Sequence, residues 1–469
     1  MFKKSFAVLL AMTMVVSFTA CKKNDSETTS SDDVEYIEQI EYEYQSGTQG
    51  SADAATSGGN SSSGGNSSSG SKKPSGGNSS TGGNSKVDPE KYRGTTVRYA
   101  TWKDPELSED GPTVKAFEEK YGIKVKIDLV SQANYNNTIA SMIASDDSPD
   151  VYFCNMFFPE CLTTMQPIDA AQLDLSDPIW DKAFIDKFTV NGKAYIVSSL
   201  GNPHGALDLL YFNKTVLKQA GFTEEQFPDK LYEKGVWTWD ALEKIMSTVK
   251  TKLGSQGYQP AFLHYDSILT STGCNMYKYE NNKFSVNLSD PFLVTVNERL
   301  ADWYQKGYIK DYNLDARDEF TTGKVAIAAI DTFGLRKKGY WQNMNQDAIG
   351  FTYLPDFDSS HKRVDSGLTL GWGIVKGAKN PVAAGIFLRY YLDANNYDTS
   401  KFFINEQAES FFYQLTSKGS SNRNFAFVWN NYMVALTTPA NVKTEIASSQ
   451  NTLQEQCNYF NNIIAKNAQ

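Results

Sequence analysis

The sequence predicts an α/β protein whose folded body forms two doubly wound lobes. The body opens with strand and helix patterns that alternate between residues 96 and 153, and similar alternation continues further along the chain. The body starts near Tyr92 and comprises about 380 residues, which is more than one hydrophobic core usually serves. These observations together favour two lobes over a single domain.

The first 20 residues are expected to be an export signal that ends before Cys21. Lys3 and Lys4 give a basic start, and the apolar run from Phe6 to Phe18 is too short to span a bilayer comfortably. The segment resembles a bacterial lipobox, although Phe18 replaces the usual Leu. We therefore expect Cys21 to be lipidated, with palmitate among the acyl chains, and to anchor the chain to the membrane. The alternative is an ordinary secretory signal with Cys21 as a bystander.

Residues 21–90 are expected to form a flexible linker. Residues 22–45 are polar and acidic, and residues 46–86 are almost entirely Gly, Ser and Asn. Such a composition buries too little apolar area to offset the entropy of ordering. A coil of this length has a span of roughly 45 Å, so the linker would hold a body at 91–469 away from the membrane.

The charge and the cysteines limit the possible partners. The formal charge is −9, and loss of the basic leader makes it about −11, which argues against a nucleic-acid partner. The remaining cysteines have no CxxC spacing, so zinc and redox motifs are not expected. Whether any of them forms a disulfide stays open. They are Cys154, Cys161, Cys274 and Cys457.

Apolar periodicity predicts the first elements of the body. Val97 and Tyr99 alternate with polar neighbours, as in a strand, and Gly111-Pro112 opens a helix that Gly122 stops. We expect a strand near 96–99, a helix near 111–121, and then a strand at 124–129, a helix at 135–143 and a strand at 151–153. This succession predicts βαβ units.

Further elements have clear local signals. Asn191-Gly192 between apolar residues predicts a two-residue hairpin turn. Thr238 is expected to cap a helix with an apolar stripe at Leu242, Ile245, Met246 and Val249. Other expected elements are strands at 207–212 and 324–330 and helices at 381–392 and 400–414. The order of the strands does not follow from these patterns.

Motifs for catalysis and metal binding are missing from the sequence. His204, His264 and His361 have no metal-ligand spacing, and neither a GxSxG elbow nor a GxxxxGK loop occurs. Gly371-Trp372-Gly373 lacks the third glycine of a dinucleotide fingerprint. No carboxylate pair stands out from the others. The sequence therefore favours a binding protein over an enzyme, with no cofactor and no metal.

Several segments of the body match one family in order. The body resembles the extracellular solute-binding proteins of bacterial ABC importers, in particular the sugar-binding group that includes maltose-binding protein. The segments are IASDDSPDVYF, VNGKAYIVSS, LLYFNKTVLKQAG, WTWDALEKI, KYENNKF, TTGKVAIAAIDTF and LGWGIVKGAKNPVAA. Departures from the family pattern, such as Ser198-Ser199 in place of a Pro and Asp331 in place of a small residue, concern the identity of the ligand.

The resemblance implies a type II periplasmic-binding-protein-like fold, with two lobes joined by crossing hinge segments and the ligand between them. Lobe 1 is expected at about 91–203 plus 328–371, and lobe 2 at about 204–327 plus 372–469. The implied partners of this monomer are a carbohydrate and the permease subunits of an ABC importer. The implied location is the outer face of the cell membrane, in a single-membrane envelope.

Sugar sites combine aromatic faces with amides and carboxylates, and sites in α/β lobes lie at the carboxyl ends of strands. The residues that this rule and the family positions select are Trp102, Asn155, Phe157, His204, Asp208, His264, Tyr265, Asp331, Phe333 and Trp372. Each could instead fill a core or a lobe interface, as expected for Trp237 and Trp239. Two other functions stay open: the same fold with a peptide, polyamine or metal complex as ligand, and a surface glycosidase or adhesin.

Overall fold

The computed structural model describes residues 87–102, 111–131, 134–154, 158–309, 317–399, 402–421, 423–424 and 439–467. The expected signal, the lipidation site Cys21 and the linker up to residue 86 lie outside the described residues. So do Asn155 and Phe157, which were expected to contact the ligand.

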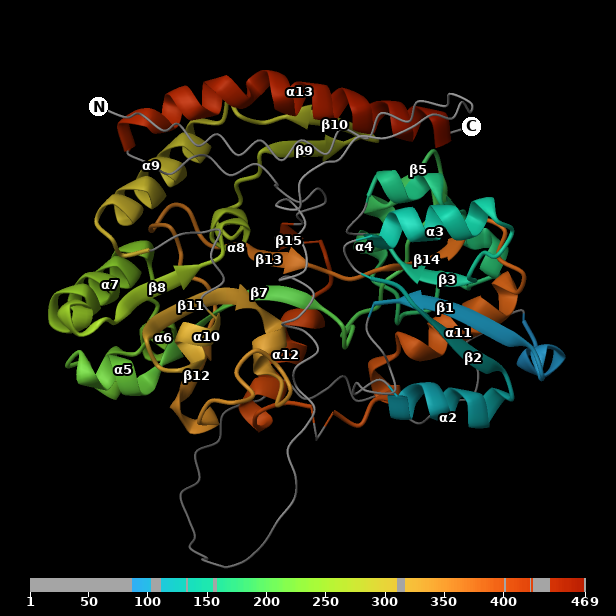
Figure 1. Cartoon of the computed structure of the whole chain (residues 1–469), viewed down its shortest axis with the longest axis horizontal. Coiled ribbons are helices and arrows are strands. Elements are labelled where there is room, and N and C mark those ends of the chain that lie inside the picture. Colours follow the sequence, from blue (N-terminus) through green and yellow to red (C-terminus); the bar gives the residue numbers. More distant parts are fainter. Residues whose placement is uncertain are drawn as a thin grey trace, which may run out of the picture. The chain divides into compact units, whose positions relative to one another are not determined.

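The first sheet has the strand order β2-β1-β3-β14-β4 (Figure 1). β1 pairs in parallel with β2 and β3, whereas β14 runs antiparallel to β3 and β4. The helices α2 and α3 follow β1 and β2, so both predicted βαβ units are confirmed. The bounds are β1 Thr96–Thr101, α2 Gly111–Tyr121, β2 Lys124–Leu129, α3 Tyr135–Ala144, β3 Val151–Phe153, β4 Met165–Gln166 and β14 Trp372–Val375.

Helix α11 (Pro381–Tyr391) covers this first sheet together with α2. Phe387 of α11 packs edge-on against Phe117 of α2, with 5.2 Å between ring centroids. Three more elements come before the second sheet in the chain: helix α4 (Lys182–Lys187) and the two strands of a hairpin, β5 (Thr189–Val190) and β6 (Lys193–Ala194). The first sheet together with these elements and its covering helices forms the first lobe.

The second sheet has the order β15-β13-β7-β11-β8, and β12 also pairs with β7. β8 lies parallel to β11, while β7 runs antiparallel to β11, β12 and β13. The long strand β7 is thus the centre of the second lobe. The bounds are β7 Ala206–Asn213, β8 Gln259–Leu263, β11 Val325–Asp331, β12 Ile349–Thr352, β13 Asp365–Leu368 and β15 Arg423–Asn424.

The helix capped by Thr238 is confirmed as α7 (Trp239–Leu253). The Thr238 hydroxyl accepts a hydrogen bond from the backbone of Ala241, and the predicted apolar stripe is buried. Helix α12 begins later than expected, at Glu406, because the Asn405 side chain caps it there. The other helices are α5 Lys214–Gln219, α6 Pro228–Glu233, α8 Tyr265–Thr270, α9 Pro291–Gln305, α10 Arg317–Thr321 and α12 Glu406–Thr416.

The strand pairing divides the chain differently from the expected lobe boundaries. β11, β12 and β13 all join the second sheet, although 328–371 was expected in lobe 1. β14 joins the first sheet, although residues from 372 onward were expected in lobe 2. The reason is that β7 pairs with β11, β12 and β13 in turn, which keeps the chain in the second lobe as far as Leu368.

The chain crosses between the two sheets three times, and polar side chains join these crossings. The Asn202 amide donates to the Ser198 hydroxyl at 2.8 Å and to the carbonyl oxygen of Leu370 at 3.0 Å. The Ser199 hydroxyl donates to the carbonyl oxygen of Leu392 at 2.5 Å. Residues 195–205 therefore contact the second crossing at 369–371 and the third after α11.

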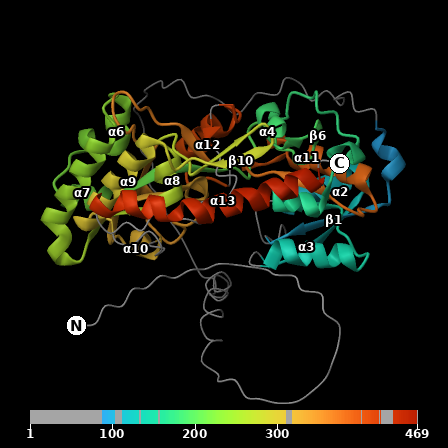
Figure 2. The same ribbon diagram turned by 90° about the horizontal axis from the view of Figure 1, so that it is seen from above.

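A hairpin and the C-terminal helix also connect the two lobes. The hairpin comprises β9 (Tyr277–Glu280) and β10 (Lys283–Val286), and α13 (Val442–Asn467) lies against it (Figures 1 and 2). The Asn461 amide exchanges two hydrogen bonds with the backbone of Phe284, at 2.7 and 2.9 Å. Six residues further on, at the C-terminal end of α13, the helix reaches the first lobe, where the Tyr195 hydroxyl donates to the carbonyl oxygen of Asn467 at 3.2 Å.

Two smaller expectations concern the hairpin turn and the cysteines. Asn191 and Gly192 connect β5 and β6 with φ angles of 49° and 76°, so the predicted two-residue turn is confirmed. The cysteines at 154, 161, 274 and 457 are buried and form no disulfide among the described residues. Burial raises the pKa of Cys274 to about 11.

Among the described helices, none has the length and apolar character needed to cross a bilayer.

Candidate functional site

Three of the expected ligand contacts meet at one edge of the second sheet. Asp208 in β7 and Asp331 at the end of β11 are direct cross-strand partners. His264 follows β8 at once, and its backbone N–H donates to the carbonyl oxygen of Ala329 in β11 at 3.0 Å. The antiparallel pairing of β7 with β11 thus brings together residues that lie more than 120 positions apart in the sequence.

Asp208 is held by two serine hydroxyls. Ser267 donates to Oδ1 at 2.7 Å, and Ser366 donates to Oδ2 at 2.9 Å. Burial raises the pKa of the Asp208 carboxyl, and the nearby Asp331 carboxyl adds to this rise, whereas the two hydroxyls and His264 oppose it. Both oxygens of Asp208 are therefore engaged by the protein, so this carboxyl acts as a fixed part of the site.

Asp331 lies beside two aromatic rings. Its Oδ2 accepts a hydrogen bond from the Tyr340 hydroxyl at 2.9 Å, and its Oδ1 accepts one from the backbone of Phe333 at 2.7 Å. The rings of Phe333 and Tyr340 are 5.0 Å apart and nearly perpendicular, and the Arg317 guanidinium lies 4.9 Å from the Tyr340 ring. Burial raises the pKa of the Asp331 carboxyl. Half-buried rings beside a carboxyl are the combination expected in a sugar site.

His264 contacts Ser267 through its ring. Nδ1 lies 3.4 Å from the Ser267 hydroxyl oxygen, which also bonds Asp208. In a nucleophilic triad the imidazole lies between the serine and the acid, whereas here the serine lies between the two. Burial also raises the pKa of the adjacent Asp266 to about 6.

A row of aromatic side chains runs through the first lobe. Trp102 packs 4.6 Å from Phe153, and Phe153 packs 5.5 Å from Trp372. Trp372 in turn packs 5.2 Å from His204. Trp102 is half-buried and forms the accessible end of this row.

Trp372 does not present a ring face as a stacking platform. It is only 2% exposed, and its indole N–H donates to the Tyr99 hydroxyl at 2.9 Å. Trp372 is buried because its strand, β14, lies between β3 and β4 inside the first sheet. The ring of Trp372 is therefore enclosed by the protein in this structure, and its contact with a ligand stays a prediction.

Tyr265 is also a core residue. It is 2% exposed, and its hydroxyl donates to the Asn297 side chain of α9 at 2.6 Å. It begins α8 and bonds a side chain of α9, so the burial of this side chain stabilises the second lobe. The expected structural role of Trp237 and Trp239 is confirmed, since both are buried.

His204 lies on the first crossing segment and contacts the third. Its ring stacks on Tyr391 at 4.8 Å, and Nε2 lies 3.1 Å from the Tyr397 hydroxyl. Because that hydroxyl donates to the carbonyl oxygen of Tyr391 at 2.7 Å, Nε2 of His204 is the donor to Tyr397. The structure thus gives His204 partners within the crossings.

The strand-end rule missed several polar residues of this site. Asp266 and Ser267 follow His264 within three positions, so a wider window after β8 would have included them. Tyr340 and Ser366 reach the site through the loop after β11 and through β13, and nothing in their local sequence marks them. The described residues contain no group of three or more His, Cys, Asp and Glu side chains arranged to hold a metal ion.

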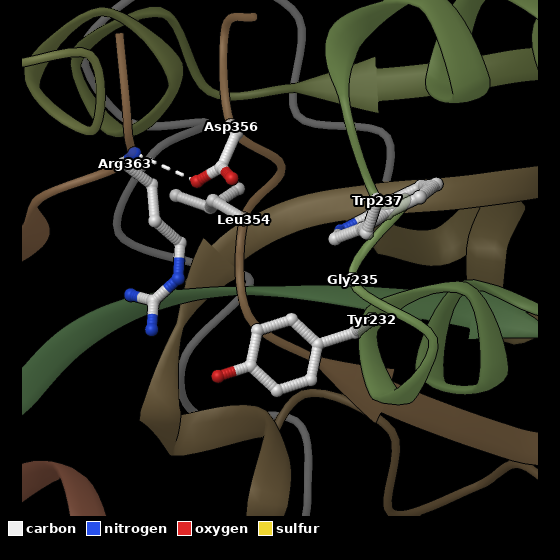
Figure 3. Close-up of a pocket in the computed structure, with 6 residues that line it drawn as sticks. All are labelled: Tyr232, Gly235, Trp237, Leu354, Asp356 and Arg363. Atoms are coloured by element: carbon white, nitrogen blue, oxygen red, sulfur yellow. Dashed lines mark hydrogen bonds between the residues drawn. The ribbon is translucent and has the colours of Figure 1, made fainter. Parts of the chain in front are cut away.

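A small cavity of about 60 Å³ lies elsewhere in the second lobe (Figure 3). Its volume suits a few water molecules and not a sugar ring. None of the expected ligand contacts lines it. The backbone N–H of Arg363 donates to Asp356 at 2.9 Å, and the Arg363 guanidinium lies 3.9 Å from the Tyr353 ring. The lining residues are Tyr232, Gly235, Trp237, Leu354, Asp356 and Arg363.

Comparisons with known proteins agree on one family. The model of the bacterial extracellular solute-binding proteins matches residues 100–397. A search among curated proteins finds no match. Solved structures share the fold across about four fifths of the chain and nearly all of their own length.

The sugar-binding protein MalE of Xanthomonas citri is 18% identical, with a TM-score of 0.57, and the match covers 79% of this chain and 98% of MalE. The GacH receptor of Streptomyces glaucescens, solved unliganded and with acarbose, is 16% identical, with a TM-score of 0.56 and coverage of 80% and 98%. The cyclic α-maltosyl-1,6-maltose binding protein of Arthrobacter globiformis is 14% identical, with a TM-score of 0.56 and coverage of 80% and 99%. These structural matches show a shared type II periplasmic-binding-protein fold.

Proposed function

Because the chain belongs to the family of bacterial extracellular solute-binding proteins, whose sugar-binding members serve ABC importers, we propose that it captures an oligosaccharide between its two lobes. It then delivers this ligand to the permease subunits of an ABC importer. Support for an oligosaccharide comes from two of the structural relatives, one described with acarbose and the other as a cyclic α-maltosyl-1,6-maltose binding protein.

The observation that carries this proposal is the polar and aromatic group at the edge of the second sheet. Asp331 bonds the backbone of Phe333 and the hydroxyl of Tyr340, Asp208 lies opposite it on β7, and His264 follows β8. Carboxylates and imidazole can take sugar hydroxyls, while the ring faces can cover the C–H surfaces of a pyranose. Trp102 would contribute an aromatic surface from the first lobe.

A ligand that contacts both lobes stabilises a closed arrangement, and the crossings provide the hinge. Ligand binding then shifts the population toward the closed state by the difference in affinity for the two states. The Asn202 and Ser199 hydrogen bonds keep the crossings together while the lobes move.

We also propose that Cys21 carries the lipid and that residues 21–90 tether the body outside the cell membrane. This proposal rests on the basic and apolar leader and on the Gly/Ser/Asn composition of the linker. Retention by a lipid keeps the binding protein near its permease, which matters most in a single-membrane envelope. Mass spectrometry of the membrane-extracted protein should find acylated Cys21, and a Cys21→Ala variant should be released into the medium.

The test of ligand capture is calorimetric titration with maltose, maltotetraose and acarbose. Saturable binding without formation of new saccharides is expected. Asp331→Ala should weaken binding on the order of 2 kcal/mol, because an anchoring carboxyl is lost. The control is Asp358→Asn, which changes an exposed carboxyl paired with His361. Hydrolysis products would establish the glycosidase instead, and tight binding of a peptide or polyamine with no sugar bound would establish another solute.

A further inference from the structure

We infer that Ser267 and Asp208 are positioning residues that fix the tautomer of His264, so that its Nε2 meets the ligand as a hydrogen-bond acceptor. This inference rests on the proposed function, because it names the kind of ligand group that the same site selects. The site would take a neutral sugar that donates hydroxyl protons, and it would reject sugar acids and sugar phosphates.

The first step concerns the proton of the Ser267 hydroxyl. A serine hydroxyl has one proton to donate and oxygen lone pairs to accept. Ser267 lies 2.7 Å from Asp208 Oδ1, and a carboxylate oxygen only accepts. Ser366 occupies Oδ2 at 2.9 Å, so Asp208 is held in one orientation. The proton of Ser267 is thus committed to Asp208.

The second step concerns the ring of His264. Nδ1 lies 3.4 Å from the same Ser267 oxygen, which can now only accept. Nδ1 must therefore carry the proton of this contact, and in a neutral imidazole the lone pair then belongs to Nε2. Within the described part of the chain, Nε2 has no hydrogen-bond partner, and the side chain is only partly buried. This nitrogen is free to accept a proton from a ligand.

The charged groups near His264 are Asp208 of β7, Asp266 of α8 and Asp331 of β11. The inference applies to the pH range in which the imidazole itself is neutral. Arg317 of α10 interacts with Asp331. A site edge made of carboxyl oxygens and an imidazole lone pair offers mainly acceptors. A ligand must bring donors to it, as sugar hydroxyls do, whereas an anionic ligand would meet like charge.

The test is the nitrogen spectrum of the full chain labelled with ¹⁵N-histidine. The chain has three histidines, so the signals of His264 can be assigned by their loss in a His264→Gln variant. Couplings to the ring protons distinguish a protonated nitrogen from a bare one. We expect a protonated Nδ1 and a bare Nε2 in the unliganded protein near neutral pH.

Matched variants separate positioning from general disturbance of the site. Ser267→Ala removes the acceptor and should move His264 toward the Nε2-protonated tautomer. Ser366→Ala removes the other hydroxyl bond to Asp208 and should leave the tautomer unchanged. A protonated Nε2 in the parent protein would overturn the inference, as would an unchanged tautomer in Ser267→Ala or an equal change in both variants.

A binding measurement tests the consequence for the ligand. Ser267→Ala should weaken maltotetraose binding roughly 2- to 10-fold, the range of one hydrogen bond, with a smaller effect for Ser366→Ala. Glucuronic acid and glucose 6-phosphate should not compete with maltotetraose, and effective competition would overturn the stated ligand class. If the parent protein binds no saccharide, the proposed function fails, while the histidine spectrum still decides the tautomer.

Discussion

Trp102 and Trp372 belong to the same aromatic row but should respond differently to substitution. Trp372 is enclosed by the first sheet and bonds Tyr99, so Trp372→Ala should lower the free energy of unfolding by about 3–5 kcal/mol, as for other large-to-small core changes. Trp102→Ala should leave the fold intact and weaken sugar binding by about 1–3 kcal/mol. Urea unfolding and calorimetry measure the two effects. An unchanged affinity in Trp102→Ala would remove Trp102 from the site.

Asp266 should make stability depend on pH. Burial raises its folded pKa to about 6, above the value of about 4 that an unfolded chain gives. The folded state therefore favours the neutral form, and stability should fall as the pH rises from about 4 through 6, by on the order of 2 kcal/mol. The Asp266→Asn variant should lack this pH-dependent part of the unfolding free energy. Thermal unfolding of both proteins across this pH range gives the comparison, and parallel curves would contradict the assignment.

Helix α13 should stabilise the body through its contact with the β9–β10 hairpin. Asn461→Ala removes both hydrogen bonds to the Phe284 backbone, which should cost about 1–3 kcal/mol of unfolding free energy. Asn458→Ala, one turn earlier on the exposed face, should cost little, because among the described residues Asn458 bonds only Gln454. Chemical denaturation of the two variants measures the difference. Equal unfolding free energies for the two variants would show that the contact between α13 and the β9–β10 hairpin contributes little to stability.

Elements with local signals could be predicted, and elements defined by distant pairing could not. The Asn191-Gly192 turn and the Thr238 cap depend on neighbouring residues, so the sequence identified both. β14 pairs with β3, more than 200 residues earlier in the chain, so neither its sheet nor the burial of Trp372 followed from periodicity. For the same reason the lobe boundaries were misplaced.

Residues of the candidate site that depend on distant pairing could not be predicted from the sequence either. Asp331 and Phe333 follow a predicted strand, so the rule that sites lie at the carboxyl ends of strands selected them. Asp208, beside the first crossing, and His264, before the KYENNKF segment, came instead from the positions that the family resemblance implies. Ser366 and Tyr340 complete the site only because β13 and the loop after β11 return to it. Their role depends on the folded arrangement and has no local sequence signal.

On the scale of the whole molecule, the proposed function requires a ligand that contacts both lobes. The crossings are tied together by Asn202 and Ser199, while α13 and the β9–β10 hairpin connect the lobes at a second place. Closure must therefore preserve or rearrange both connections. In the proposed mechanism, ligand capture changes the distance between the lobes, and the permease recognises this change.

The most direct test measures that distance with spin labels on Glu119→Cys in α2 and Lys252→Cys in α7, both at exposed positions. Pulsed electron paramagnetic resonance should show a shorter and narrower distance distribution after addition of saturating maltotetraose. A control pair within the first lobe, Glu119→Cys with Lys193→Cys, should not change. Binding of the sugar without any change between the lobes, or no binding of any saccharide in the calorimetric series, would contradict the account.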